Sequence, residues 1–241
     1  MNYTRIFTSQ DFHFGDQLTL SSEASKHLRK VLRKKQGNLI ELFDGKGTSC
    51  LAEIISLDKN KLEVRVVEEK VFKARHGINI FLGQSLIKSE PFRFSIQKAT
   101  ELGVISITPL ITERTVVKLN HHSKISRHSR WKTIAVGACQ QCGENWMPEI
   151  NQIQNLESWC NQVKAKHKIV LSPQAKMKLS DFNYRQSVAV TVGPEGDFTQ
   201  NEISFLKKRG FIPVSLGERL LRAETAVVSS LSSIRTMCKE F

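Results

Sequence analysis

The sequence lacks any segment suited to a membrane or to secretion. None of its apolar runs approaches the ~18 residues that a membrane-spanning helix needs. The first residues hold no apolar core of signal-peptide length. We therefore expect a cytoplasmic protein with no membrane partner.

Cysteine is scarce, and its spacing is uninformative with one exception. The five cysteines are odd in number and widely scattered among 241 residues, so we expect reduced thiols. Only Cys139 and Cys142 have a spacing typical of metal ligands. No second pair accompanies them, and His121, His122 and His128 stand at no ligand interval. The sequence therefore predicts no metal site.

Acidic residues are missing from two long stretches. The chain has 23 Asp and Glu against 36 Lys and Arg, a net charge of +13. No acid occurs between Glu23 and Glu41, or between Arg114 and Gly143. Neighbouring cations repel one another until a polyanion docks, so the composition points to nucleic acid or an anionic surface as partner.

Residues 1–73 have the pattern of short strands separated by turn residues. Strands of this length and spacing predict a small β-barrel domain. The expected strands cover residues 17–20, 39–43, 50–55 and 61–67.

One helix is expected among these strands, over residues 22–36. Its inner face would carry Ala24, Leu28, Val31 and Leu32. The rest of the helix is basic, which fits either a solvated face or a surface that follows RNA phosphates, and we favour the second. The candidate RNA-binding residues of this helix are His27, Arg29, Lys30 and Arg33.

From residue 74 to residue 241, strands and helices alternate. This order predicts an α/β domain with a largely parallel sheet covered by helices. Strands are expected at residues 78–82, 104–111, 168–171, 187–192 and 211–216. Helices are expected at residues 89–102, 126–142, 199–210 and 224–238.

The second acid-free stretch lies in this α/β domain. Residues 120–123 have the composition of an exposed loop, and the helix over 126–142 would turn Ile134 and Ala138 inward. The positive charge of the stretch favours RNA contact. Its candidate residues are Arg114, Lys118, Arg127 and Arg130.

Two of the expected strands end at glycine. Residues 187–192 are followed by Gly193-Pro194-Glu195-Gly196, which suits a type I turn, and residues 211–216 are followed by Gly217. Strand ends that open into glycine loops are a usual ligand site in an α/β sheet. The two loops therefore predict a small-molecule pocket.

Five motifs in order resemble the RsmE family, SPOUT-class methyltransferases of ribosomal RNA. They are HLRKVLR at 27–33, QKATELGV at 97–104, CQQCG at 139–143, GPEGDF at 193–198 and LGERLLRAETA at 216–226. The resemblance covers essentially the whole chain. It implies a PUA-like β-barrel over residues 1–73, followed by a SPOUT domain over residues 74–241 with a deep trefoil knot.

The resemblance also implies the reaction and the partners. It implies a homodimer, S-adenosylmethionine as methyl donor, and N3 of a uridine in 16S rRNA of the small ribosomal subunit as target. The knot loops would enclose the cofactor largely through backbone groups, where glycine allows a close approach. The implied cofactor-binding residues are Leu171, Ser172, Gly193, Pro194, Glu195, Gly196, Leu216, Gly217, Leu220, Leu221 and Arg222.

The chain departs from the family pattern at several positions. Gln140 and Glu144 stand where relatives commonly carry an acid and a basic residue. Pro91 and Phe92 replace a basic residue and Met, and Asp197 replaces a glycine. These departures concern the grip on RNA more than the chemistry.

Methylation of a uracil ring nitrogen needs positive charge near the flanking carbonyl oxygens and a proton acceptor. Arg222 is the candidate for the charge, because a guanidinium stabilises the imidate anion. Glu224 is the candidate acceptor, but it serves equally well as the N-terminal acid of the last helix. Glu195 and Arg219 are held in reserve.

Two other functions remain open at this point. A non-catalytic RNA-binding module needs only the basic surfaces and leaves the glycine loops unexplained. A SPOUT ribose 2′-O-methyltransferase shares the knot but not the basic N-terminal domain.

Overall fold

The chain forms two compact units. The computed structural model describes residues 3–58, 61–71, 75, 77–117 and 120–241. Unit 1 contains Met1–Arg75 and Cys139–Met147, and unit 2 contains His76–Ala138 and Pro148–Phe241. The expected boundary at residues 73–74 lies outside the described residues. The assignment of Cys139–Met147 to unit 1 departs from the division expected from the sequence.

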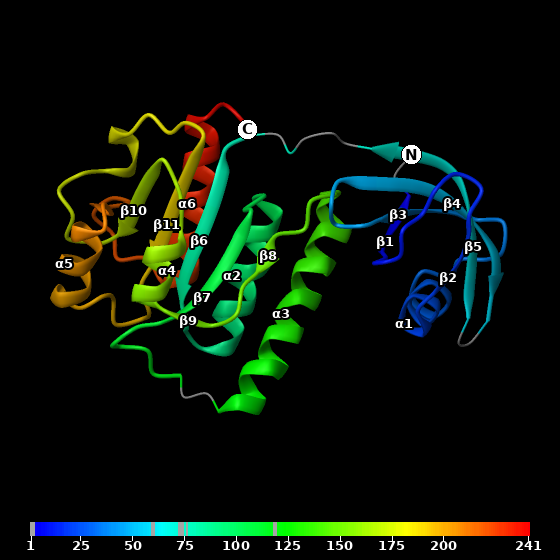
Figure 1. The fold of residues 1–241 in the computed structure, drawn as a ribbon, viewed down its shortest axis with the longest axis horizontal. Helices are drawn as coiled ribbons and strands as arrows, with labels where there is room; N and C mark the ends of the chain where they lie inside the picture. The colour runs from blue at the N-terminus through cyan, green and yellow to red at the C-terminus, as the bar shows by residue number, and fades with distance from the viewer. Residues whose placement is uncertain (1–2, 59–60, 72–74, 76, 118–119) are drawn as a thin grey trace. The chain divides into compact units, whose positions relative to one another are not determined.

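Unit 1 is built on a five-stranded sheet in the order β1-β3-β4-β5-β2 (Figure 1). The expected strands at 17–20 and 39–43 are confirmed, β4 and β5 are longer than expected, and β1 was not predicted. β1 pairs parallel with β3, and the other neighbours are antiparallel. The strands are β1 (Thr4–Phe7), β2 (Gln17–Leu20), β3 (Leu39–Phe43), β4 (Thr48–Leu57) and β5 (Leu62–Val71).

The helical segment of unit 1 is shorter than predicted. Helix α1 (Ser22–Lys26) continues as a single π-helical turn, η1 (His27–Val31). Leu28 is fully buried in the apolar core of the unit, as predicted. Val31 and Leu32 are exposed, so their predicted burial is wrong.

The early end of the helix has a local cause. Arg33 adopts a positive φ of 50°, which a right-handed helix does not tolerate. The Lys34 N–H then donates to the Leu28 carbonyl at 2.9 Å, closing the end of the segment. The widened π turn also shifts the side chains after Leu28 around the helix axis, away from the inner face.

Long-range hydrogen bonds hold residues 139–147 on unit 1. Arg5 of β1 donates to Asn145 Oδ1 at 2.5 Å and to the Glu144 carbonyl at 3.2 Å, and it also pairs with Glu41. Gln140 donates to the Arg5 carbonyl at 2.8 Å. Gln140 and Glu144, the two positions where the sequence analysis noted unusual residues, therefore make hydrogen bonds within unit 1.

Unit 2 contains a parallel sheet, which confirms the α/β prediction. The strand order is β12-β10-β11-β6-β7-β8, with β9 also beside β7, and all neighbouring strands run parallel. The strands are β6 (Asn79–Ser85), β7 (Ser106–Ile111), β8 (Glu149–Ile150), β9 (Gln154–Asn155), β10 (His167–Leu171), β11 (Ser187–Val192) and β12 (Ile212–Val214).

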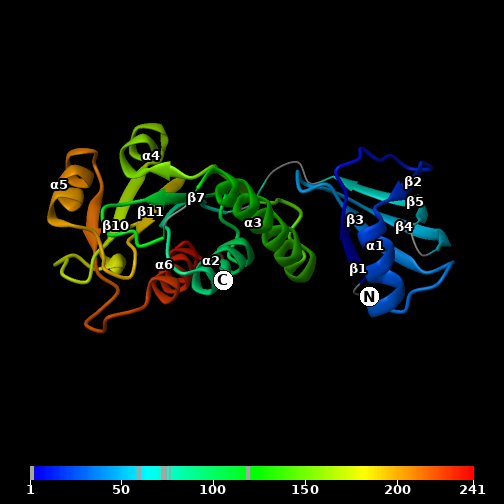
Figure 2. The same ribbon diagram turned by 90° about the horizontal axis from the view of Figure 1, so that it is seen from below.

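Helices cover both faces of this sheet. Figure 2 shows α2 (Ser89–Glu101) and α6 (Ala223–Met237) together on one face, and α4 (Leu156–Gln162) and α5 (Gln200–Lys208) on the other. A short 3₁₀ turn, η2 (Leu179–Asp181), follows β10. The predicted capping box at Thr199 is present at the start of α5 and is confirmed. Among the described residues, no helix has both the length and the apolar character that crossing a bilayer requires.

Helix α3 (His121–Cys142) begins five residues before its predicted start. The loop expected at residues 120–123 is therefore wrong for most of its length. Asn120 acts as a cap, because its Oδ1 accepts from the Ser123 N–H at 2.8 Å. Ala138 is buried as predicted, whereas Ile134 is half-buried and Trp131 carries the inward packing against Phe92, with ring centroids 4.8 Å apart.

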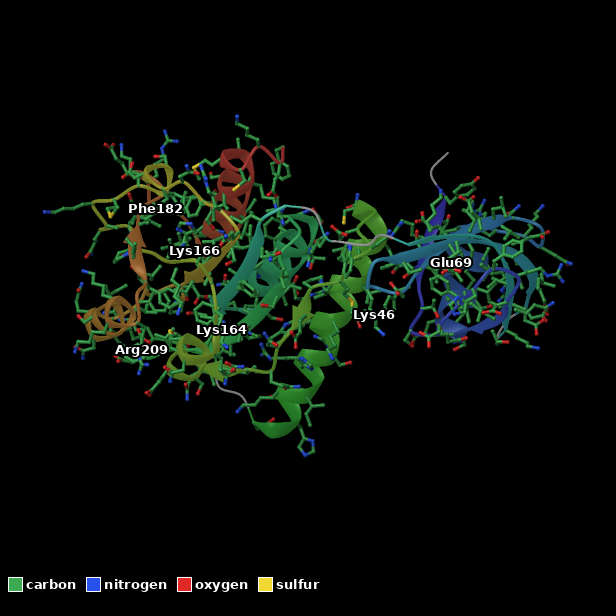
Figure 3. The ribbon with its side chains drawn as sticks, turned by 45° about the horizontal axis from the view of Figure 1, so that its top comes forward. Lys46, Glu69, Lys164, Lys166, Phe182 and Arg209 are labelled. Atoms are coloured by element: carbon green, nitrogen blue, oxygen red, sulfur yellow. The ribbon has the colours of Figure 1, made fainter. Side chains whose placement is uncertain are left out.

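Charged side chains outside the core also pack on aromatic rings. The guanidinium of Arg209, labelled in Figure 3, lies 5.3 Å from the centre of the Phe205 ring at the end of α5. The Lys168 ammonium likewise lies 5.5 Å from the centre of the Phe211 ring. Such contacts cover apolar surface while the charges stay in solvent. A contact between two uncharged rings lies nearby, where Phe182, also labelled, stacks on Tyr184 with centroids 5.8 Å apart.

Gly83 of β6 provides a test of the packing beneath the sheet. A Cβ at this position would lie 2.6 Å from the buried ring of Trp159 in α4. We expect Gly83→Ala to lower the free energy of unfolding by about 1–3 kcal/mol, because a rigid indole has no room to move. Urea denaturation measures the change.

Gly137→Ala is the matched control. Gly137 lies within α3, and a Cβ there meets no atom within 4 Å. This substitution should raise the free energy of unfolding by about 0.5–1 kcal/mol through helix propensity. Equal effects of the two substitutions would contradict the packing of Trp159 on β6.

Candidate functional site

Three loops of unit 2 meet at one edge of the parallel sheet. Strand β10 lies between β11 and β12, so the carboxyl ends of these three strands are neighbours. The loops that leave them are residues 172–174, 193–198 and 215–222. They surround a pocket of about 950 Å³. A crevice at the carboxyl edge of a parallel sheet is the general location of ligand sites in such folds.

The pocket brings together the residues predicted for the cofactor. All eleven line its wall, from Leu171 at the end of β10 to Arg222 before α6, and so does Glu224. Their roles remain predictions, but their positions in the fold agree with a common ligand.

The loop at 193–198 is the most constrained part of the wall. It runs between two buried residues, Val192 and Phe198. The Asp197 N–H donates to the Pro194 carbonyl at 2.9 Å, so the turn covers residues 194–197, one residue later than predicted. The reason is that Asp197, and not Gly196, takes the left-handed conformation, with φ of 59°.

Gly193 lies under this turn. A Cβ there would be 3.0 Å from Asp197 Oδ1 and 3.1 Å from the Phe198 nitrogen. The turn therefore folds back onto the main chain of Gly193, and a larger residue would push it outward. This close approach is a physical reason for glycine at the end of β11.

Two side chains fasten the loop to neighbouring segments. The Lys88 N–H, just before α2, donates to Glu195 Oε1 at 3.1 Å. Arg114, after β7, donates through Nη1 to the Gly196 carbonyl at 2.6 Å. Next to it, the Glu113 N–H donates to Oε1 of the buried Glu202 at 2.9 Å. The segment after β7 is thus hydrogen-bonded both to the loop at 193–198 and to the start of α5.

Asp197 places a partly buried carboxylate in the pocket wall. Burial raises the pKa of this carboxyl, while its bond from the Phe198 N–H, at 2.7 Å, and the nearby Arg114 lower it. The net shift is upward. The carboxylate at position 197 therefore changes the electrostatics of the pocket.

The third loop is open. Gly217 has a φ of 119°, and a Cβ there would meet no atom within 4 Å. Leu220 is 83% exposed although it lines the pocket. Arg222 is the N-cap residue of α6 and makes no side-chain cap bond, and Glu224 follows in the first turn of that helix.

Several residues of the wall were missed by the sequence analysis. Lys88 and Pro91 enter from the start of α2, and Gln200 and Ile203 from α5. The signal that would have found Lys88 is its position just beyond the carboxyl end of β6, next to β11. The α5 residues had no such signal, because they follow a turn rather than a strand.

The predicted RNA-binding residues lie on both units. Arg114 lines the pocket in unit 2, and Arg127 and Arg130 lie on α3. Lys118 lies outside the described residues. The others belong to the helical segment of unit 1 or follow it directly: His27, Arg29, Lys30 and Arg33.

The Cys139 and Cys142 pair shows no metal-binding arrangement. Burial, reinforced by the nearby Cys142, raises the pKa of the Cys139 thiol to about 12, and metals bind the deprotonated form. Cys142 is exposed. Within the described part of the chain, no three histidine, cysteine, aspartate or glutamate residues cluster as metal ligands do.

The sequence matches known families over both units. Residues 74–235 match the family described as RNA methyltransferase domain, and residues 20–67 match the RNA methyltransferase PUA domain. Ribosomal RNA small subunit methyltransferase E from Buchnera aphidicola subsp. Schizaphis graminum is 31% identical over 237 residues. The match covers 96% of this chain and 95% of that relative.

Solved structures resemble the whole chain. A methyltransferase from Legionella pneumophila in complex with the bound cofactor SAM has a TM-score of 0.94 and 35% identity, with 98% of each chain covered. A ribosomal RNA small subunit methyltransferase E from Neisseria gonorrhoeae bound to S-adenosyl methionine has a TM-score of 0.91 and 31% identity, again with 98% of each chain covered.

The raised pKa of Asp197 gives a test of its burial. The folded chain holds the carboxyl proton more tightly than the unfolded chain, so the free energy of unfolding falls as the pH rises from the ordinary carboxyl pKa through the raised pKa of Asp197. Asparagine does not ionise. We therefore expect Asp197→Asn to become more stable than the original protein as the pH rises between these two pKa values. Below the ordinary carboxyl pKa this gain should disappear. Urea denaturation at neutral and acidic pH measures it.

Asp11→Asn is the control, because Asp11 is exposed. It should show no comparable dependence on pH. The same pH profile for both substitutions would contradict the burial of the Asp197 charge.

Proposed function

This chain belongs to the RNA methyltransferase family, and we propose that it methylates N3 of a uridine in 16S rRNA, with S-adenosylmethionine as donor. The target lies in the small ribosomal subunit near the decoding region, and the site of action is the cytoplasm. The observation that carries the proposal is the single pocket that gathers all eleven predicted cofactor residues at the edge of a parallel sheet.

The pocket fits S-adenosylmethionine in size and in the character of its wall. Its volume of about 950 Å³ is within the range of ~300–1,000 Å³ that small-molecule sites occupy. The open space beside Gly217 leaves main-chain groups accessible to a nucleoside. Glu195 and Asp197 add carboxylates that suit the sulfonium and ammonium cations of such a molecule. When bound, the cofactor supplies an electrophilic methyl group on its sulfonium.

Arg222 is placed to stabilise the uracil anion. Neutral N3 has no available lone pair and must lose its imide proton near the time of attack, which leaves charge on the flanking carbonyl oxygens. The exposed Arg222 side chain lines the pocket, and it pairs with no other side chain within the described residues. Its guanidinium therefore remains available to the target base.

Glu224 keeps both of its roles. It lines the pocket, as a proton acceptor must, and it lies in the first turn of α6, where an acid stabilises the helix dipole. Glu195 is the weaker alternative as acceptor, because its carboxylate already accepts the Lys88 N–H. Arg219 also lines the pocket and remains the reserve cation.

We assign two roles to Arg114: it supports the loop at 193–198, and it contacts the RNA. One of its N–H groups is bonded to the Gly196 carbonyl, and the side chain is otherwise exposed in an acid-free stretch. We assign it to the approach of the RNA phosphate as well as to the support of the loop. Arg127 and Arg130 on α3 add positive charge for RNA in unit 2, and the basic segment adds it separately in unit 1.

The proposal includes three structural expectations. The loops around the pocket form a deep trefoil knot, unit 1 is a PUA-like barrel, and the protein acts as a homodimer. The exposed Leu220 beside the pocket offers apolar surface to a second subunit.

The position of the transferred methyl group tests the function. The protein is incubated with labelled S-adenosylmethionine and small subunits that lack the modification, and the label is located by mass spectrometry. We expect label on uracil N3. Label on a ribose 2′-oxygen would identify the other SPOUT chemistry, and RNA binding without label would identify a non-catalytic module.

Arg222→Ala tests the proposed mechanism. Loss of one charge at a developing anion lowers turnover by about 10²–10³-fold in comparable sites. We expect a loss of that size in kcat, with rRNA affinity nearly intact, measured by methyl transfer and by filter binding. Arg185→Ala, at an exposed position outside the pocket lining and outside the predicted RNA-binding residues, is the control and should keep its turnover number. Full activity of Arg222→Ala would eliminate this role.

A further inference from the structure

The helical segment of unit 1 ends in two neighbouring apolar residues that face solvent. Val31 is 65% exposed and Leu32 is 39% exposed. They stand among closely spaced basic residues, with no acid nearby in sequence. The basic residues are Lys26, His27, Arg29, Lys30, Arg33, Lys34 and Lys35.

The backbone holds these two side chains outward. Leu28, fully buried, anchors the segment in the core of unit 1. The π turn and the left-handed Arg33 then end the helix before Val31 and Leu32 reach the inner face. A regular α-helix would have placed both beside Leu28. A conformation that exposes apolar area and strains a non-glycine residue is a feature typical of functional sites.

A second observation comes from Arg29, which lies between the buried and exposed residues. Its Nε is buried, and within the described residues it has no hydrogen-bond partner. The residue as a whole is half-buried. The end of this segment thus combines exposed apolar side chains with a guanidinium whose Nε donor has no partner in the described part of the chain.

Charge identifies the kind of partner. Seven basic residues in ten positions require an anion, and the proposed substrate is RNA. Phosphates satisfy the cations but leave apolar side chains without a contact. Unpaired bases supply one, because their faces are apolar and accessible only where the RNA is not in a duplex.

We propose that Val31 and Leu32 form an apolar contact for unpaired bases of the substrate RNA, while the surrounding cations bind its phosphates. Unit 1 then recognises single-stranded character and not only charge. This inference rests on the proposed function for the choice of RNA, but it concerns a surface that belongs entirely to unit 1.

The test compares an apolar variant with a charge variant. The apolar variant carries Val31→Ser and Leu32→Ser, and the charge variant carries Lys30→Gln and Lys35→Gln. Binding is measured with unmodified, deproteinised 16S rRNA over a range of salt concentrations. We expect the apolar variant to lose about tenfold in affinity, from the apolar area left uncovered, with an unchanged slope of log affinity against log salt. The charge variant should lower that slope by about 0.7 per lost phosphate contact.

Three controls give the comparison its meaning. Phe14→Ser removes a side chain of unit 1 that is 74% exposed but lies outside the basic run, and it should leave RNA affinity unchanged. A fully paired RNA duplex should bind the original protein and the apolar variant equally. Unchanged S-adenosylmethionine affinity and thermal unfolding would show that the variant is folded.

Several outcomes would overturn the inference. They are unchanged affinity of the apolar variant for 16S rRNA, an equal loss on the duplex, or a reduced salt slope. A loss seen only with assembled subunits would mean that Val31 and Leu32 contact a ribosomal protein, which also contradicts it. Methyl transfer by the original protein is measured separately, so a failure of the proposed function is distinguishable from a failure of this contact.

Discussion

Parallel pairing of β10 with both β11 and β12 is the constraint on which the site depends. It places at one edge three loops that are separated in sequence by 15 residues or more. Strand β12 is only three residues long and contains Pro213, which lacks an N–H and suits its place at the end of the strand order. Backbone bonds beyond the strand compensate, since Ser215 donates to the Met177 carbonyl at 2.8 Å and accepts from the Leu179 N–H at 3.1 Å. The third loop is therefore anchored to the segment after β10 as well as to the sheet.

The two ligands of the proposed reaction make different physical demands. A small cofactor needs a defined enclosure, and rigid strand ends supply it with main-chain groups and a few side chains. A long polyanion needs charge spread over a surface, which the exposed cations of η1 and α3 supply. Arg114 lies where these demands meet, because it supports the enclosure and belongs to the charged stretch.

The sequence predicted best where a local pattern decides the structure. Residues 187–192 are β-branched and end at glycine, so strand β11 was predicted to the residue. The pocket was predictable because ligands of α/β proteins commonly bind at glycine-containing loops that follow the carboxyl ends of parallel strands. The helix predicted over residues 22–36 begins as predicted but ends early, because the apolar spacing of Val31 and Leu32 is the same whether or not a π turn forms around Leu28. The turn at Gly193 was misplaced by one residue, because the sequence pattern did not show that Asp197 takes the left-handed position, where its carboxylate accepts the Phe198 N–H. Strand β1 pairs with β3, which lies far along the chain, so no local pattern predicts it. The attachment of residues 139–147 depends on Arg5, whose partners in that segment lie 135 or more residues away and leave no local signal.

The attachment of residues 139–147 to unit 1 bears on how the protein is made. The N-terminal 75 residues leave the ribosome first, but the partners of Arg5 at Gln140, Glu144 and Asn145 are synthesised much later. Domains generally fold in the order of synthesis, as units. Here the first unit receives its last segment only after β6, α2, β7 and α3 have been translated. Until then, Arg5 has its ion pair with Glu41 but lacks the hydrogen bonds to the Glu144 carbonyl and to Asn145. A pause in translation before residue 147 would therefore hold the nascent chain with its first domain incomplete.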